Sequence, residues 1–268
     1  MVTCVIVGEQ AGSVVRQCVS IARRCLALIG LLSLAACAPP EGNRAIILSR
    51  VMLGEQFLRN DEYGKAYDIL EGVAAGDPTS SAAALSLADA YYRHGAYMKA
   101  AASYSKAVEL DAQVDGRLGL ARVELARSNP HAARAYLQDV LVHEPDNLQA
   151  LNSLGVAYEL FGKPDLAQQA YQHVLALDPT NKNAHNNLAL SLALNGQAQV
   201  ALPRIAELSR ANLDDKAIRQ NLAIIEFLAD NTVDAMRVAK IDLTDREARQ
   251  NFRSLDYYRK ARSGAFAD

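Results

Sequence analysis

The segment LQALNSLGVAYELFGKPDLAQQAYQHVLALDPTN, residues 148–181, decides the fold of this chain. The chain as a whole is rich in Ala and Leu, sparse in aromatic residues and free of Trp, a composition that favours closely packed helices over strands. The small residues Gly155 and Ala167 allow two helices to approach until their backbones nearly touch. A helix ends at Asp178-Pro179, because proline disfavours helix in the residue before it and lacks a backbone N–H.

The turn at Asp178-Pro179 recurs along the chain at a regular period of about 34 residues. Pro145 lies one period before Pro179, and Pro78 lies two periods less one residue before Pro145. The corresponding turns at 110–112 and 212–214 lack proline. This period predicts six repeats, of which the last is degenerate. Their expected ranges are 47–80, 81–113, 114–147, 148–181, 182–215 and 216–243.

Each repeat resembles the tetratricopeptide repeat, in which small residues stand at fixed places on two helices. The second and fourth repeats carry the pattern most fully. Their matching residues are Leu87-Ala88, Tyr91, Gly95, Ala100, Tyr104 and Ala107, and Leu154-Gly155, Tyr158, Gly162, Ala167, Tyr171 and Pro179. The resemblance implies an all-α superhelix, an α-solenoid of five to six helix pairs over residues 47–243, in which neighbouring pairs bury each other's apolar faces.

The end of such a stack needs a cover for its last apolar face. Thr244 and Glu247 have the spacing of a capping box and predict the start of a final helix. Ala248, Phe252 and Leu255 would lie on one side of it. We therefore expect residues 244–268 to form a C-terminal capping helix and tail. A partner-binding tail is the alternative.

The segment 1–36 has the features of a signal peptide. Three arginines precede an apolar run of about twelve residues, too short to span a membrane comfortably. The run ends in Leu34-Ala-Ala-Cys37, which resembles a bacterial lipobox and implies covalent lipid on Cys37. The alternative is an uncleaved apolar segment. Ala38, rather than Asp, favours sorting to the outer membrane, with the body in the periplasm. Residues 37–46 would be the lipidated cysteine and a short, irregular tether.

Little in the sequence indicates catalysis or a cofactor. The formal net charge is -2, which argues against a nucleic-acid partner. All four cysteines lie at or before Cys37, and none of the five histidines pairs with another at metal-ligand spacing. Phosphate-binding loops, nucleophile elbows and dinucleotide fingerprints are absent from the sequence. We expect no enzyme activity, no metal, no small-molecule substrate and no cofactor other than the lipid on Cys37.

The resemblance to tetratricopeptide repeats also implies where a partner protein would bind. In that family the first helix of each repeat lines a concave groove, to which its fifth and ninth residues contribute. In the fourth, fifth and sixth repeats, the fifth residues carry amides and the ninth are apolar. Amides can pair with the backbone of an extended peptide whatever its sequence. The alternative is that the apolar residues only pack against adjacent helices. The candidate groove comprises Asn152, Val156, Asn186, Leu190, Gln220 and Ile224.

The C-terminal part resembles the TadD family of lipoproteins, which belong to the tight-adherence (Flp) pilus system. The resemblance rests on residues 186–190 (NNLAL) and 219–223 (RQNLA), and continues through Ala235, Ala239, Asp242-Leu243 and Asn251. It implies a protein that helps the pilus secretin to form or localise in the outer membrane. An envelope scaffold for cell-wall enzymes, outer-membrane protein assembly or polysaccharide export is the alternative. A soluble regulator of an enzyme is disfavoured by Cys37.

Overall fold

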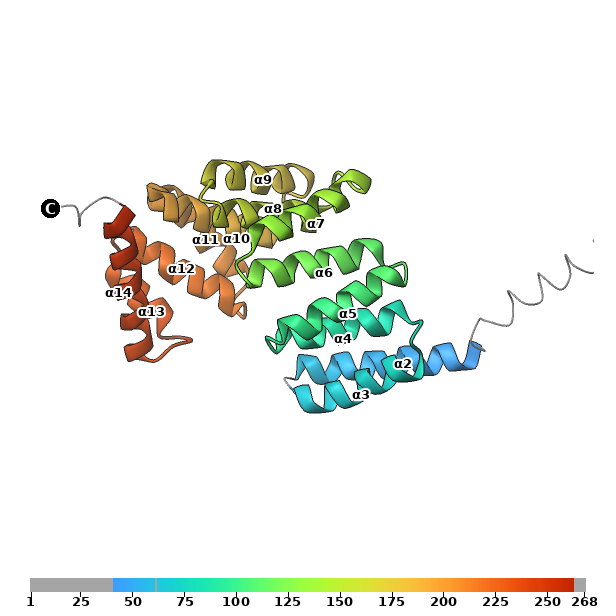
Figure 1. Cartoon of the computed structure of the whole chain (residues 1–268). Helices are drawn as coiled ribbons and strands as arrows, with labels where there is room; N and C mark the ends of the chain where they lie inside the picture. The colour runs from blue at the N-terminus through green and yellow to red at the C-terminus, as the bar shows by residue number, and fades with distance from the viewer. Residues whose placement is uncertain (1–40, 61, 263–268) are drawn as a thin grey trace, which may run out of the picture.

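The computed structural model describes residues 41–60 and 62–262, and this part of the chain consists of helices and turns. Six helix pairs follow one another in chain order from α2 at one end to the final helix, α14, at the other (Figure 1). The predicted all-α superhelix with a C-terminal capping helix is confirmed. The pairs are α2 (Glu41–Arg59) with α3 (Tyr63–Gly76), α4 (Ser81–Arg93) with α5 (Tyr97–Glu109), α6 (Gln113–Ala126) with α7 (Pro130–His143), α8 (Leu148–Leu160) with α9 (Pro164–Leu177), α10 (Lys182–Leu192) with α11 (Ala198–Ala211), and α12 (Lys216–Leu228) with α13 (Thr232–Ala239), before α14 (Asp245–Arg262).

The helices form two layers. Each first helix packs on the first helix of the next pair, in the order α2, α4, α6, α8, α10 and α12. The second helices, from α3 to α11, make their extensive contacts with first helices instead. Because the first helices are the more closely stacked layer, they line the inner, concave side of the superhelix.

Small residues set the distance between adjacent helices, within a pair at Gly155, as the sequence predicts, and between two neighbouring pairs at Gly119. A Cβ atom added to Gly155 would lie 2.3 Å from Cε1 of Tyr171, and one added to Gly119 would lie 2.2 Å from Cε1 of Tyr104. Both tyrosines are almost fully buried, and Ala167 is fully buried. The glycines therefore hold the space that the two tyrosine rings occupy.

The turn inside each of the last five pairs contains one residue with a left-handed backbone at the same place in the repeat. Three of these residues are glycines, which adopt this conformation without steric cost. The other two are Ser128, with φ of 57°, and Asp230, with φ of 64°. The glycines are Gly95, Gly162 and Gly196.

Polar side chains define the starts of the first helices. Thr180 N donates to Asp178 Oδ1 at 3.0 Å, and Thr79 N donates to Asp77 Oδ1 at 3.1 Å, so both Asp-Pro-Thr turns close in the same way. The next residues cap the helices that follow, since Ser80 Oγ accepts from Ala83 N and Asn181 Oδ1 accepts from Ala184 N. The recurring turn thus both ends one repeat and starts the next.

The N-terminal boundary differs from the expected one. Helix α2 begins at Glu41, inside the segment 37–46 that we expected to be irregular. Residues 41–46 contain no proline, so each supplies the backbone N–H that a helix requires. Cys37 and the predicted signal peptide lie outside the described residues.

Helix α14 covers the last pair. Its predicted capping box is formed, because Thr244 N donates to Glu247 Oε2 at 2.8 Å and Glu247 N donates to Thr244 Oγ1 at 3.3 Å. The Phe252 ring stacks on Phe227 of α12 with 4.7 Å between ring centroids. Buried Ala248 belongs to the same apolar cluster. Across residues 41–60 and 62–262, no helix combines the length and apolar character needed to span a membrane.

Candidate partner-binding site

The six residues of the candidate groove occupy equivalent places on three consecutive first helices. Helix α8 carries Asn152 and Val156, and α10 carries Asn186 and Leu190. Gln220 and Ile224 follow on α12. Residues four apart share one face of a helix, and all six side chains are partly buried. The predicted groove residues therefore lie in register on the inner layer.

Asparagine side chains connect these three helices through a continuous series of hydrogen bonds. Asn221 Nδ2 on α12 donates to Asn186 Oδ1 on α10 at 2.9 Å. Asn186 Nδ2 donates to Asn187 Oδ1, and Asn187 Nδ2 donates to Asn152 Oδ1 on α8, both at 3.2 Å. We call these four residues the amide chain. It contains Asn152 and Asn186, as predicted, but Asn221 replaces the predicted Gln220 at its end.

The amide chain leaves hydrogen-bonding capacity for a ligand. An asparagine side chain has two N–H donors and an oxygen with two lone pairs. Asn186 and Asn187 each use one N–H and one lone pair within the chain. At the two ends, the Asn152 amide N–H groups and the Asn221 amide oxygen bond to none of the described side chains. These ends offer a donor and an acceptor, which are the two groups that a peptide bond pairs with.

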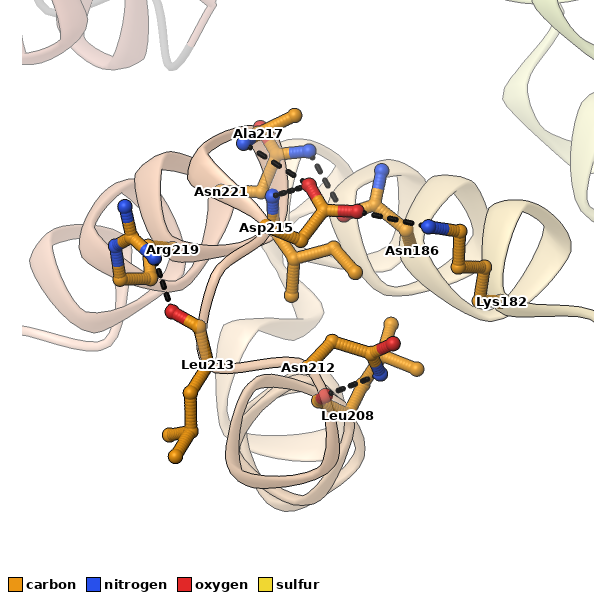
Figure 2. Close-up of polar contacts among 10 residues, drawn as sticks. Lys182, Asn186, Leu208, Asn212, Leu213, Asp215, Ala217, Arg219 and Asn221 are labelled. Atoms are coloured by element: carbon orange, nitrogen blue, oxygen red, sulfur yellow. Dashed lines mark hydrogen bonds and ion pairs between the residues drawn. The ribbon is translucent and has the colours of Figure 1, made fainter.

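Figure 2 shows the contacts that hold α10 beside α12. Lys182 Nζ on α10 lies 3.0 Å from Asp215 Oδ2, while Asp215 Oδ1 accepts from the backbone N–H groups of Ala217 and Ile218 at the start of α12. The hydrogen bond from Lys182, together with these N–H groups, lowers the pKa of the Asp215 carboxyl. The amide contact between Asn186 and Asn221 adjoins this ion pair, so the register of the two helices is doubly specified.

The apolar groove residues differ in their surroundings. Val156 packs against the large core cluster around Tyr171 and Ile205, as the packing alternative anticipates. Ile224 and Gln220 instead line a cavity of about 290 Å³ between α12, α13 and α14. The other walls of this cavity are mostly apolar and include Ala223, Ala239, Leu243, Ala248, Asn251, Phe252, Ser254 and Leu255.

The N-terminal half of the inner layer carries charged side chains that form hydrogen bonds or an ion pair within the chain. Ser86 Oγ on α4 donates to Glu55 Oε1 on α2 at 2.9 Å. Arg122 Nη2 on α6 lies 3.1 Å from Asp89 Oδ1 on α4, and the buried Tyr104 hydroxyl donates to the same carboxylate. Burial raises the pKa of the Tyr104 hydroxyl far above its ordinary value, and the hydrogen bond to Asp89 is the second-largest cause.

Sequence reasoning missed three residues of this surface. Asn187 and Asn221 stand one repeat period apart, immediately after the fifth positions, so a search of the sixth positions would have found them. Glu159, on α8, follows Asn152 by two helical turns and therefore lies on the same face. Its Oε1 atom is buried and has no hydrogen-bond partner in the described part of the chain.

Two segments on which the pilus-family resemblance rests meet in the structure. Arg219 Nη2 on α12 lies 2.7 Å from Asp242 Oδ1, and Arg219 Nε donates to Asp242 Oδ2 at 3.0 Å. The two side chains are 16% and 10% exposed, which makes this a well-shielded, two-pronged ion pair. It ties the segment after α13 to α12, one of the three helices that carry the amide chain.

Comparison with solved structures shows the same architecture. A thermophilic tetratricopeptide repeat protein of Thermus thermophilus is 20% identical, with a TM-score of 0.61, over 68% of this chain and 99% of its own. PilW, described as a widely conserved type IV pilus biogenesis factor, is 20% identical with a TM-score of 0.61, over 73% of this chain and 91% of its own. At these identities the similarity concerns the fold.

Sequence comparison gives a short match and a family. The uncharacterized protein y4yS of Sinorhizobium fredii (strain NBRC 101917 / NGR234) is 41% identical over 56 residues, which are 21% of this chain and 31% of that protein. This chain thus spans about a third of that relative. Profiles of the tetratricopeptide repeat match residues 51–115, 118–182 and 170–201, together more than half of the sequence. With the helix pairs and their recurring turns, this match shows that the chain belongs to the tetratricopeptide repeat family.

Proposed function

We propose that this protein is a non-catalytic adaptor of the outer membrane, anchored by lipid on Cys37, that binds protein partners through the inner surface of α8, α10 and α12. As a tetratricopeptide repeat protein it is a protein-interaction scaffold. The observation that carries the proposed binding surface is the amide chain, because its unused donors and acceptors can pair with the backbone of an extended segment.

We further propose that the partner belongs to a tight-adherence pilus, most directly its secretin or another assembly component. The C-terminal resemblance supports this assignment, and the residues that carry it include the Arg219–Asp242 ion pair beside the amide chain. The fold similarity to PilW, a pilus biogenesis factor by description, is consistent with the same role.

In-cell crosslinking of the tagged full-length protein, followed by mass spectrometry of the outer-membrane fraction, tests this function. Recovery of a secretin with other pilus components supports the pilus role. Recovery of cell-wall enzymes, barrel-assembly proteins or polysaccharide exporters instead overturns it in favour of a different envelope scaffold. Cys37→Ser is the matched control for the anchor: it should move the protein from the membrane to the soluble fraction, and an unchanged distribution would contradict lipidation at this residue.

A further inference from the structure

Two buried tyrosines at equivalent places in the repeat have different polar surroundings. Tyr104 of the second repeat and Tyr171 of the fourth occupy the same place on their helices, two repeats apart. Beside Tyr104, the chain supplies both an anion, Asp89, and a cation, Arg122. Beside Tyr171 it supplies the anion Glu159, whose charge adds to burial in raising the pKa of Tyr171.

No cation stands beside Tyr171 at the place that Arg122 has beside Tyr104, and the anion beside Tyr171 comes from a different position of the repeat. The Arg122 guanidinium lies over the Tyr92 ring, 4.4 Å from its centroid. In the fourth and fifth repeats, the equivalents of Tyr92 and Arg122 are Glu159 and Leu190. Glu159 forms no ion pair within residues 41–60 and 62–262, and its Oε1 is buried without a donor. The buried oxygen is therefore an acceptor that an incoming cationic donor could satisfy.

A second feature of the same surface accepts an apolar group. The cavity beside Gln220 and Ile224 holds about 290 Å³ and has mainly apolar walls. This volume is at the lower limit for small-molecule sites but suits a large apolar side chain. Gln220 and Ile224 on α12 stand at the places that Asn152 and Val156 have on α8, so these two residues of the cavity wall belong to the inner layer.

The separation of the two features sets a spacing for a ligand. Packed helices lie about 8–10 Å apart, so α8 and α12, two steps apart, are separated by roughly 16–20 Å. An extended chain advances about 3.3 Å per residue, and roughly five to six residues cover this span. The amide chain runs between the two features and faces the backbone of that segment.

We propose that the partner presents an extended segment with two anchoring side chains. This proposal rests on the proposed binding surface. An arginine or lysine pairs with Glu159, and a large apolar side chain, about five to six residues away, enters the cavity beside Ile224. The chemistry of the site thus selects a basic-plus-apolar peptide of defined spacing.

Selection of random peptides of about twelve residues displayed on phage, with the full-length protein in detergent as bait, tests this proposal. Wild-type protein should enrich a basic and an apolar position at this spacing. Glu159→Gln, which keeps shape but removes charge, should lose the basic position and keep the apolar one. Ser254→Phe, which fills the cavity from its exposed rim, should lose the apolar position and keep the basic one. Glu207→Gln on α11 and Gln250→Phe on α14 are matched controls at exposed positions that line neither feature, and should select as wild type does.

A binding measurement with selected peptides, on wild-type protein and on Glu159→Gln, tests the ion pair separately from the peptide selection. Replacing the basic residue of a selected peptide by glutamine should weaken its affinity about tenfold for wild type and leave that for Glu159→Gln nearly unchanged. An equal loss for both proteins, or no enriched basic position, would overturn the proposal. In that case, binding of the enriched peptides to Asn221→Ala tests the surface itself. If this substitution weakens their binding, the proposed binding surface stands although the two-anchor proposal fails. If it weakens the binding of none of them, surface and proposal fail together.

Discussion

The Asn221 side-chain amide on α12 donates a hydrogen bond to the Asn186 side-chain oxygen on α10. Asn186 in turn donates to Asn187, and Asn187 donates to Asn152 on α8. Polar side chains therefore connect three successive repeats on the surface that we assign to partner binding. The same atoms that specify the register of the helices carry the unused donors and acceptors. A substitution in the amide chain is therefore expected to affect both stability and the proposed binding.

Replacing Asn186 with alanine should destabilise the protein moderately. The substitution removes two side-chain hydrogen bonds and leaves Asn221 without its acceptor, for an expected loss of about 1–2 kcal/mol in the free energy of unfolding. Urea unfolding followed by circular dichroism measures the loss. Asn183→Ala, at an exposed position on the same helix, is the control and should change little. Equal effects of the two substitutions would show that the amide chain contributes nothing to stability.

Replacing Gly155 with alanine should be costly because the new methyl group would overlap the Tyr171 ring. Overpacking of this kind costs about 1–3 kcal/mol. Gly72→Ala, within helix α3, is the control. A Cβ atom added there would lie 3.7 Å from its nearest neighbour, an Arg50 side-chain atom, so the substitution should stabilise the protein slightly. A double-mutant cycle with Tyr171→Leu identifies the cause, since the smaller side chain should reduce the penalty of the alanine. Strictly additive effects would refute the overlap.

Replacing Ser128 with glycine should stabilise the protein by about 0.5–1 kcal/mol, because Ser128 has a left-handed backbone at the place where three other repeats carry glycine. Relief of that strain outweighs the greater entropy of glycine in the unfolded chain. A higher Tm in calorimetry would support this. Ser128→Ala keeps the strain, so a gain of the same size in that variant would point to a different origin.

The ion pair between Arg219 and Asp242 should make stability dependent on acidic pH. The Arg219 guanidinium, through its hydrogen bonds, lowers the pKa of Asp242 in the folded protein. The resulting stabilisation is complete above the unfolded-state pKa of about 3.9 and is lost as pH falls through the lower folded-state pKa. Asp242→Asn should therefore have a lower Tm at pH 7 and a smaller further loss between pH 5 and pH 2. Parallel Tm curves for the variant and the wild type would contradict this linkage.

The regular features of the fold follow from local sequence. The Asp-Pro turns end helices because proline cannot continue the backbone hydrogen bonds. Small residues at the spacing of Gly155 and Ala167 indicate close helix contacts. The capping box at Thr244 is equally local. The start of α2 at Glu41 was missed because glycine and asparagine near a double proline indicated a loop, although nothing in residues 41–46 prevents a helix.

The proposed binding surface was predicted only in outline because its details depend on contacts between repeats. Position counting placed Asn152 and Asn186 correctly on the inner layer, but the hydrogen bond from Asn221 requires the actual offset of α12 against α10. The difference between Val156, packed into the core, and Ile224, beside a cavity, depends on how α14 sits over the last pair. Likewise, the burial of the Glu159 Oε1 atom without a donor depends on how the neighbouring helices pack.

Site-specific photocrosslinking in cells tests the central claim most directly. A photoreactive residue at Asn183, exposed at the start of α10 and on the face of Asn186, is compared with one at Gln172, exposed on the second helix α9. If partners bind the inner surface, the probe at Asn183 should form a discrete protein adduct, containing a pilus component, that the probe at Gln172 does not form. An adduct from Gln172 with none from Asn183 would contradict the assignment of the inner surface as the partner-binding site.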